Sequence, residues 1–166
     1  MREQVSSAIR VASADDGDAI YALTAAAFGR SDEAELVNRL RADGDSVLEL
    51  VAVGEALDGH ILFSRLHVDP ATIRLTGLAP VSVTPERQGE GIGGALVREG
   101  LARCKAMGFD AVAVLGDPAY YKRFGFTRRA AKGLTCVYSG PAYQAVELRD
   151  GALAGEWHVR YARAFD

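Results

Sequence analysis

The strongest constraint on this chain is a glycine-rich segment between an apolar run and an apolar-periodic helix. Residues 83–94 read Val-Thr-Pro-Glu-Arg-Gln-Gly-Glu-Gly-Ile-Gly-Gly. Glycine has no Cβ, so its backbone can approach an anion closely. A helix that follows offers unpaired N–H groups and the positive end of its dipole. The segment therefore predicts a strand–loop–helix unit whose loop binds an anionic group such as a phosphate.

Two common phosphate-binding signatures fit this segment poorly. A Walker A loop ends in Gly-Lys-Ser/Thr, and Gly93-Gly94-Ala95 has neither the lysine nor the hydroxyl. Gly89-x-Gly91-x-x-Gly94 matches the dinucleotide fingerprint, but that motif belongs at the first strand–helix turn, with an acid closing the next strand. Here it lies mid-chain, and Asp110 would open the next strand. An NAD-dependent oxidoreductase remains an alternative, as does a glycine turn that binds nothing.

A third pattern, Gln88-x-x-Gly91-x-Gly93 after Val83-x-Pro85-Glu86, resembles the coenzyme A loop of the GCN5-related N-acetyltransferases. Tyr120-Tyr121-Lys122-Arg123-Phe124-Gly125-Phe126 is similar to the Tyr-x-x-x-Gly-Phe segment of the same family. Two motifs at the proper separation are more specific than one. The segments 60–64 and 115–121 are similar to a subgroup of small bacterial proteins described as predicted N-acetyltransferases.

Composition restricts the function classes. The chain has 166 residues, 49% apolar and 25% charged, which suits one soluble domain over residues 1–166. A net charge of −3 argues against nucleic acid as a partner. The apolar runs are too short to cross a bilayer and the N-terminus has no signal-peptide core, so we expect a cytoplasmic protein without a membrane partner.

Neither a metal site nor a disulfide is expected. Cys104 and Cys136 lack metal-like spacing and are predicted to be free thiols, and the three histidines are scattered. A basic run is open to two interpretations, a solvated face or a role in holding coenzyme A phosphates. It comprises Arg123, Arg128, Arg129 and Lys132.

The first half of the chain predicts a strand, two helices and an antiparallel meander. Ser13-x-x-Asp16 has the pattern of a capping box, and Glu35 and Arg39 are spaced for an ion pair on the second helix. Asp58-Gly59 predicts a turn within residues 57–60. The predicted strands cover residues 6–12, 47–53, 60–68 and 73–83, and the predicted helices follow Asp16 up to Phe28 and cover residues 32–41.

The second half predicts a parallel strand pair joined by a helix. Apolar residues from Ile92 to Cys104 lie on one helical face and Gly108 ends the helix. The wholly apolar run Ala111–Leu115 predicts a strand covered on both faces, parallel to the strand before the glycine loop. Asp117 and Pro118 begin a short helix up to Phe124. Further strands are predicted at residues 135–138, 142–148 and 157–161.

This element order also resembles the acetyltransferase family and covers nearly the whole chain. The resemblance implies an α/β (mixed α+β) acyl-CoA N-acyltransferase fold: a mostly antiparallel sheet with a splayed parallel strand pair, flanked by about four helices. Pro80 cannot donate to a sheet ladder, so it predicts a bulge or an unpaired edge where those two strands part. Their free backbone groups would hold the pantetheine arm like an added strand.

The resemblance implies acetyl-CoA as the co-substrate, without a metal. The pyrophosphate would rest on the loop amides, with Arg87 adding charge. The residues expected to contact the cofactor are Val81, Ser82, Val83, Arg87, Gln88, Gly89, Glu90, Gly91, Ile92, Gly93, Gly94, Tyr121 and Phe124.

By the same resemblance, Tyr121 is the general acid that protonates the leaving sulfur, since a phenol has a pKa of about 10. A backbone N–H near Val83 would stabilise the oxyanion. No general base is assigned. The carboxylate and imidazole candidates are Glu35, His67, Asp69 and Asp117.

The expected acceptor is a primary amine of a small molecule or peptide, attacked directly in a ternary complex. Its pocket is predicted between residues 29–32 and 138–143. A non-catalytic acyl-CoA sensor is the alternative. A homodimer is possible by analogy with the family.

Overall fold

The computed structural model describes residues 7–166. The helices are α1 (Gly17–Phe28), α2 (Asp32–Ala42), α3 (Ile92–Ala106) and α4 (Pro118–Tyr121). The strands are β1 (Ala8–Val11), β2 (Ser46–Val53), β3 (Leu57–Asp69), β4 (Leu75–Val83), β5 (Ala111–Leu115), β6 (Leu134–Thr135), β7 (Tyr143–Glu147) and β8 (Trp157–Tyr161).

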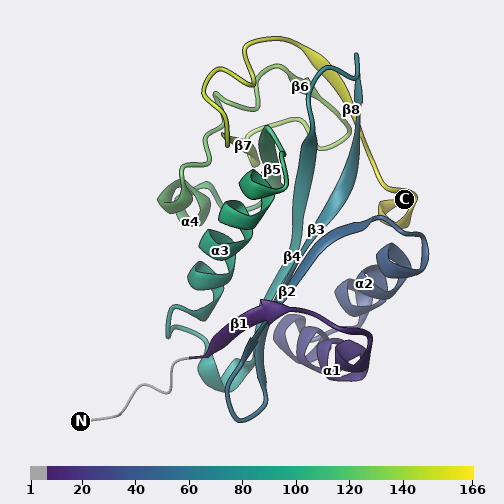
Figure 1. The fold of residues 1–166 in the computed structure, drawn as a ribbon, viewed down its shortest axis with the longest axis vertical. Coiled ribbons are helices and arrows are strands. Elements are labelled where there is room, and N and C mark those ends of the chain that lie inside the picture. The colour runs from purple at the N-terminus through teal and green to yellow at the C-terminus, as the bar shows by residue number, and fades with distance from the viewer. Residues whose placement is uncertain (1–6) are drawn as a thin grey trace.

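The strands form one mixed sheet between two helical layers (Figure 1). Its main order is β1-β2-β3-β4-β5-β7, and β8 joins β3 and β6. The β4–β5 and β6–β8 pairs are parallel and the other named pairs are antiparallel. Apolar side chains of α3 pack on one face with Phe63 and Val114. Those of α1 and α2 pack on the other with Val51 and Leu62. The predicted fold class is confirmed.

The two parallel strands separate halfway along β4, close to the end of β5. They are in register from Leu75 with Ala111 to Leu78 with Val114, and no further pair is present within the described residues. β4 nevertheless continues to Val83 alongside β3. Pro80 lies at the register shift between Leu78 and Val81, so it marks a bulge, as its missing N–H requires. The predicted parting of the strands is therefore present.

The long strand β3 connects both parts of the sheet. Its first half pairs with β2 and β4, whereas Leu66–Asp69 pair with β8. Within the sheet, β4 is paired with β3 directly, and β5 is joined to β3 through β4.

Local sequence signals account for several element ends. Ser13 and Asp16 form the predicted capping box, although the turn it begins is a 3-10 turn and α1 itself starts at Gly17. Gly29 ends α1 with a φ of 69°, and the Asp117 carboxylate caps α4 by accepting from Ala119 N at 2.9 Å. The predicted strand over residues 6–12 is observed from Ala8, while Ser6 lies outside the described residues.

Three local predictions were wrong. Asp58 and Gly59 lie within β3 and form no turn, because the chain already reverses at residues 54–56, where Gly54 N donates to Ala56 O at 2.9 Å. Glu35 accepts a hydrogen bond from the Tyr21 hydroxyl at 2.6 Å in place of an ion pair with Arg39. Of the strand predicted at residues 135–138, only Thr135 is in β6, because a turn follows in which Ser139 N donates to the Cys136 carbonyl.

The contact between α3 and β3 at Gly100 gives a test of core packing. A Cβ at Gly100 would lie 2.5 Å from Phe63 Cζ, and Phe63 is fully buried. We expect Gly100→Ala to lower the free energy of unfolding by about 2 kcal/mol and Tm by roughly 4–8 °C. Gly17→Ala is the control, since its Cβ would meet an ordinary contact at 3.8 Å. It should stabilise the protein slightly. Equal Tm values for the two variants would contradict this account.

Candidate active site

The glycine loop presents unpaired backbone amides. None of the amides of Gln88–Gly91 donates to a backbone carbonyl within residues 7–166. Gly89 and Gly91 have φ values of 82° and 86°, which favour glycine, and Gly91 is the N-cap of α3. The amides of Ile92–Gly94 are in the first turn of α3, where a helix has no acceptors of its own. The loop and helix together therefore form a site for an anion.

These amides border an open hollow of about 470 Å³. It brings together the predicted residues Val83, Arg87, Gln88, Gly89, Gly91, Ile92, Gly93, Gly94 and Phe124. The guanidinium groups of Arg98 and Arg123 and the ring of Tyr120 also line it. Arg123 stacks on the Tyr120 ring at 4.4 Å from its centroid, and Arg98 on Phe124 at 5.0 Å. Arg98 and Tyr120 were missed as pocket residues, although Arg98 lies one turn after Gly94.

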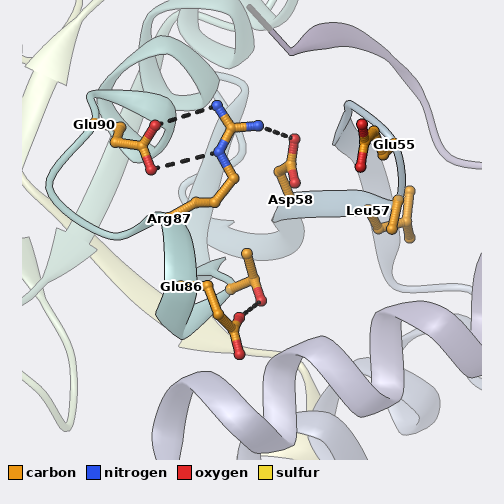
Figure 2. Close-up of a pocket in the computed structure, with 8 residues that line it drawn as sticks. Glu55, Leu57, Asp58, Glu86, Arg87 and Glu90 are labelled. Atoms are coloured by element: carbon orange, nitrogen blue, oxygen red, sulfur yellow. Dashed lines mark hydrogen bonds and ion pairs between the residues drawn. The ribbon is translucent and has the colours of Figure 1, made fainter. Parts of the chain in front are cut away.

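Arg87 has a second role beside this hollow (Figure 2). Its Nη1 lies 2.8 Å from Asp58 Oδ2, and its Nη2 lies 3.3 Å from Glu90 Oε1. The Asp58 side chain is only 8% exposed and also accepts from Ser7 Oγ. Asp58 belongs to β3 and Glu90 to the loop, so Arg87 ties the glycine loop to the sheet. Glu90 faces this ion pair and is not among the residues lining the hollow.

We expect Asp58→Asn to weaken acetyl-CoA binding through this ion pair. The change removes the charge that orients Arg87, so the loop amides become less ordered before the ligand arrives. Kd should rise about fivefold with kcat unchanged, the effect of losing one partly buried pair. Isothermal titration calorimetry and steady-state kinetics measure these quantities. Glu86→Gln is the matched control, because Glu86 is exposed and accepts from Thr84 Oγ1 rather than from Arg87. Equal Kd values in both variants would refute the role of Asp58.

The unpaired part of β4 turns backbone groups toward the separation from β5. Thr84 N donates to Asp58 O on β3 at 2.8 Å. Successive backbone groups of a strand point to opposite edges, so those of Val83 and Val81 point away from β3. The Val83 carbonyl accepts from Gln88 Nε2 at 3.1 Å. The side chain of Ser82 is buried next to His60 on β3, so only its backbone could belong to this edge.

Tyr121 lies beside the open end of β5. Its ring packs on Gly116, where a Cβ would be 2.6 Å away, and contacts Phe126 edge-on. It belongs to the same cluster as Val81, Val83 and Val114. Burial, with a smaller effect of Tyr120, raises the pKa of Tyr121 to about 12. The hydroxyl has no hydrogen-bond partner within the described residues and stays protonated at neutral pH. Tyr121 is therefore an available donor at the end of the parted strands.

The four base candidates lie in separate places. Asp117 caps α4 and Glu35 binds Tyr21, as described above. His67 and Asp69 are exposed near the end of β3, paired with Arg160 and His158 of β8. The structure brings none of them into the hollow beside the glycine loop.

A buried ionic cluster on the sheet was missed. Glu49 Oε1 lies 2.7 Å from His60 Nε2, and Arg41 Nε donates to Glu49 Oε2 at 2.9 Å. Burial raises the pKa of Glu49, but hydrogen bonds from His60 and Arg41 outweigh it, so the pKa is lowered overall and the carboxylate is charged at neutral pH. His60 Nδ1 and Ser82 Oγ are buried without a partner in the described residues. The sequence signal that could have revealed this cluster was Glu49, a charged residue within the otherwise apolar strand predicted at residues 47–53.

Comparison with known proteins identifies the family. Residues 8–129 match the model of an acetyltransferase (GNAT) domain. The uncharacterized N-acetyltransferase YhbS of Escherichia coli K12 is 38% identical over 164 residues, which cover 93% of this chain and 98% of YhbS. The chain belongs to the GNAT family. YjhQ, an uncharacterized N-acetyltransferase of the same organism, is 40% identical over 135 residues, 76% of this chain and 73% of YjhQ.

Solved GNAT structures superimpose closely. YhbS from E. coli in complex with CoA has a TM-score of 0.91 and 36% identity over 99% of this chain and 94% of that one. A GNAT acetyltransferase from Brucella melitensis in complex with acetyl-CoA has a TM-score of 0.83 and 37% identity, over 98% of this chain and all of the other. The GNAT family and fold identify this chain as an acyltransferase, which removes the oxidoreductase alternative.

Neither a candidate metal site nor a candidate membrane span is present in residues 7–166. No group of three or more His, Cys, Asp or Glu in this range is placed to hold a metal ion. No helix there is both long and apolar enough to cross a bilayer.

Proposed function

We propose that this protein transfers the acetyl group of acetyl-CoA to a primary amine of a small molecule or peptide, by direct attack in a ternary complex. The observation that carries the proposal is the combination of unpaired loop amides with two parallel strands that part beside them. Relatives with TM-scores of 0.91 and 0.83 hold CoA and acetyl-CoA.

The donor is assigned to the hollow beside the glycine loop. The pyrophosphate accepts from the amides of Gln88–Gly94, while Arg98 and Arg123 add positive charge. The pantetheine arm then lies in the β4–β5 separation and bonds the free edge of Val81 and Val83. This path leads the thioester from the start of α3 toward Tyr121.

Transfer requires donors for the oxygen and the sulfur of the thioester. The Val83 N–H points into the separation and stabilises the oxyanion as the amine attacks. The Tyr121 hydroxyl donates to the sulfur as the C–S bond breaks. Because a thiol has a pKa of about 8.5, full proton transfer to the departing thiolate from a phenol with a pKa of about 12 is unfavourable. Tyr121 therefore stabilises the departing thiolate as a hydrogen-bond donor, and the thiolate takes its proton from water.

The acceptor is expected to approach from the sheet face opposite α3. The ammonium group gives its proton to water before attack, or the fraction of the amine that is already neutral attacks directly. The buried Glu49–His60 pair lies on this face, where His60 Nδ1 and Ser82 Oγ have no hydrogen-bond partner among residues 7–166. A dedicated base among Glu35, His67, Asp69 and Asp117 is not required.

A kinetic experiment tests the proposal. The protein is incubated with acetyl-CoA and a panel of primary amines, and released coenzyme A and acetylated amine are measured by mass spectrometry. We expect intersecting double-reciprocal plots and no acetylated enzyme. Parallel plots with an acetyl-enzyme would contradict direct attack. Tight acetyl-CoA binding without turnover of any amine would favour the sensor function.

A further inference from the structure

The basic run noted in the sequence divides between two different pockets. Arg123 lines the hollow beside the glycine loop, together with Arg98. Arg128, Arg129 and Lys132 line another open hollow, of about 610 Å³. The donor site thus already has cations of its own, and the remaining three need another explanation.

The second hollow is positively charged and partly hydroxylic. The hydroxyl-bearing residues Thr135 and Ser139 line it, and buried Tyr143 forms part of its wall. No Asp or Glu is among its described lining residues, and none of its three cations has an ion-pair partner within residues 7–166. In a chain with a net charge of −3, three unpaired cations at one hollow form a local site for an anion.

This hollow, which we call the basic pocket, adjoins the end of β5. Tyr143 pairs with Leu115, and Gly116 N donates to Ala142 O at 3.1 Å. Gln144 Nε2 donates to Gly116 O at 3.1 Å, which fixes the same junction. Tyr121 packs on this same Gly116.

The two tyrosines lie on opposite faces of the sheet. Tyr121 clusters with residues that contact α3, whereas Tyr143 clusters with Ala113 and Trp157 on the other face. The basic pocket is therefore on the side from which an acceptor would approach, and the donor hollow is on the other.

We propose that the acceptor is an amine that also carries an anionic oxygen group, a carboxylate or a phosphate, and that Arg128, Arg129 and Lys132 bind this group. Guanidinium groups match both anions in shape and charge. The anion in the basic pocket then directs the amine of the same molecule toward the thioester at the end of β5. The inference rests on the proposed function. It predicts that polyamines, which have no anionic group, are poor acceptors.

Matched pairs of amines test the proposal. The ligands are β-alanine against propylamine and O-phosphoethanolamine against ethanolamine, titrated into the protein with and without saturating coenzyme A by calorimetry. We expect the anionic member to bind at least about tenfold more tightly, and the preference to shrink at high salt. Comparing the Kd values of β-alanine and O-phosphoethanolamine shows whether the pocket prefers a carboxylate or a phosphate.

Charge reversal separates the possible outcomes. Arg128→Glu and Arg129→Glu should each remove the preference while leaving coenzyme A affinity unchanged. Arg39→Glu, an exposed change on α2, is the matched control. Equal affinities within each pair, or weaker coenzyme A binding in the Arg128 and Arg129 variants, would overturn the proposal. A bound anionic amine that is never acetylated would instead count against the proposed function and leave the binding result intact.

Discussion

Tyr121→Phe is expected to lower kcat about 100-fold with little change in the Kd of acetyl-CoA. The variant keeps the ring that packs on Gly116 and Phe126 and removes only the buried hydroxyl. The sulfur then leaves without a hydrogen-bond donor. Rapid-quench or steady-state assays give kcat, and calorimetry gives Kd.

Tyr120→Phe is the comparison variant for this effect. Tyr120 is adjacent in sequence and its ring contacts Tyr121 edge-on, but it lines the donor hollow. Its kcat should stay within about threefold of the wild type, because its hydroxyl is not placed at the sulfur. A Tyr121→Phe protein with wild-type turnover would refute the assignment of the donor.

The pH dependence gives a second readout for Tyr121. A group whose pKa is raised to about 12 remains protonated as pH rises through the neutral range. We therefore expect no loss of kcat from Tyr121 deprotonation below about pH 10. An alkaline fall in kcat near pH 8 that disappears in Tyr121→Phe would contradict the raised pKa.

Gly93→Val is expected to raise the Kd of acetyl-CoA roughly 30-fold or more. A Cβ at Gly93 would lie 3.1 Å from the Tyr120 hydroxyl and 3.5 Å from Val83 Cγ2, within the space assigned to the phosphates. Losing one charge-assisted hydrogen bond costs about 1.5–3 kcal/mol, and the branched side chain keeps the phosphates from the amides of the first turn. Calorimetry with acetyl-CoA measures the change.

Ala95→Val controls for helix propensity in this experiment. Ala95 is exposed in the same turn of α3 and is not among the residues lining the donor hollow. Val has a lower helix propensity than Ala but a higher one than Gly, so any weakening of the helix should be greater in Ala95→Val and should appear as a lower Tm. Only Gly93→Val should lose affinity. If Gly93→Val bound acetyl-CoA like the wild type, the phosphates would have to lie elsewhere.

The sequence predicts those parts of the site that depend on nearby residues. The glycine loop, the bulge at Pro80 and the cap at Asp117 are local, since a backbone that must bend or lose an N–H restricts which residues can stand there. The order of strands around α3 also follows, because a strand, a helix and a strand in succession form a right-handed parallel unit.

Contacts between distant residues were not predictable in the same way. Asp58 reaches Arg87 across 29 positions, and its Asp-Gly pair had suggested a turn. Glu49 meets His60 only because β2 and β3 pair in one register. The basic run divides between two pockets because Gly125, with a φ of 92°, turns the chain after Phe124. Each of these depends on register or on a chain reversal that no single motif specifies.

The shared strand β3 has a consequence for engineering. Residues 75–124 supply the proposed donor half and residues 128–143 the basic pocket, and both consecutive segments are attached to a frame that includes β3. A transplanted stretch from another family member, inserted between Phe126 and Tyr143, would leave the cofactor cradle intact. Exchanging this one segment could then change which acceptor is preferred, without redesign of the residues that bind the thioester.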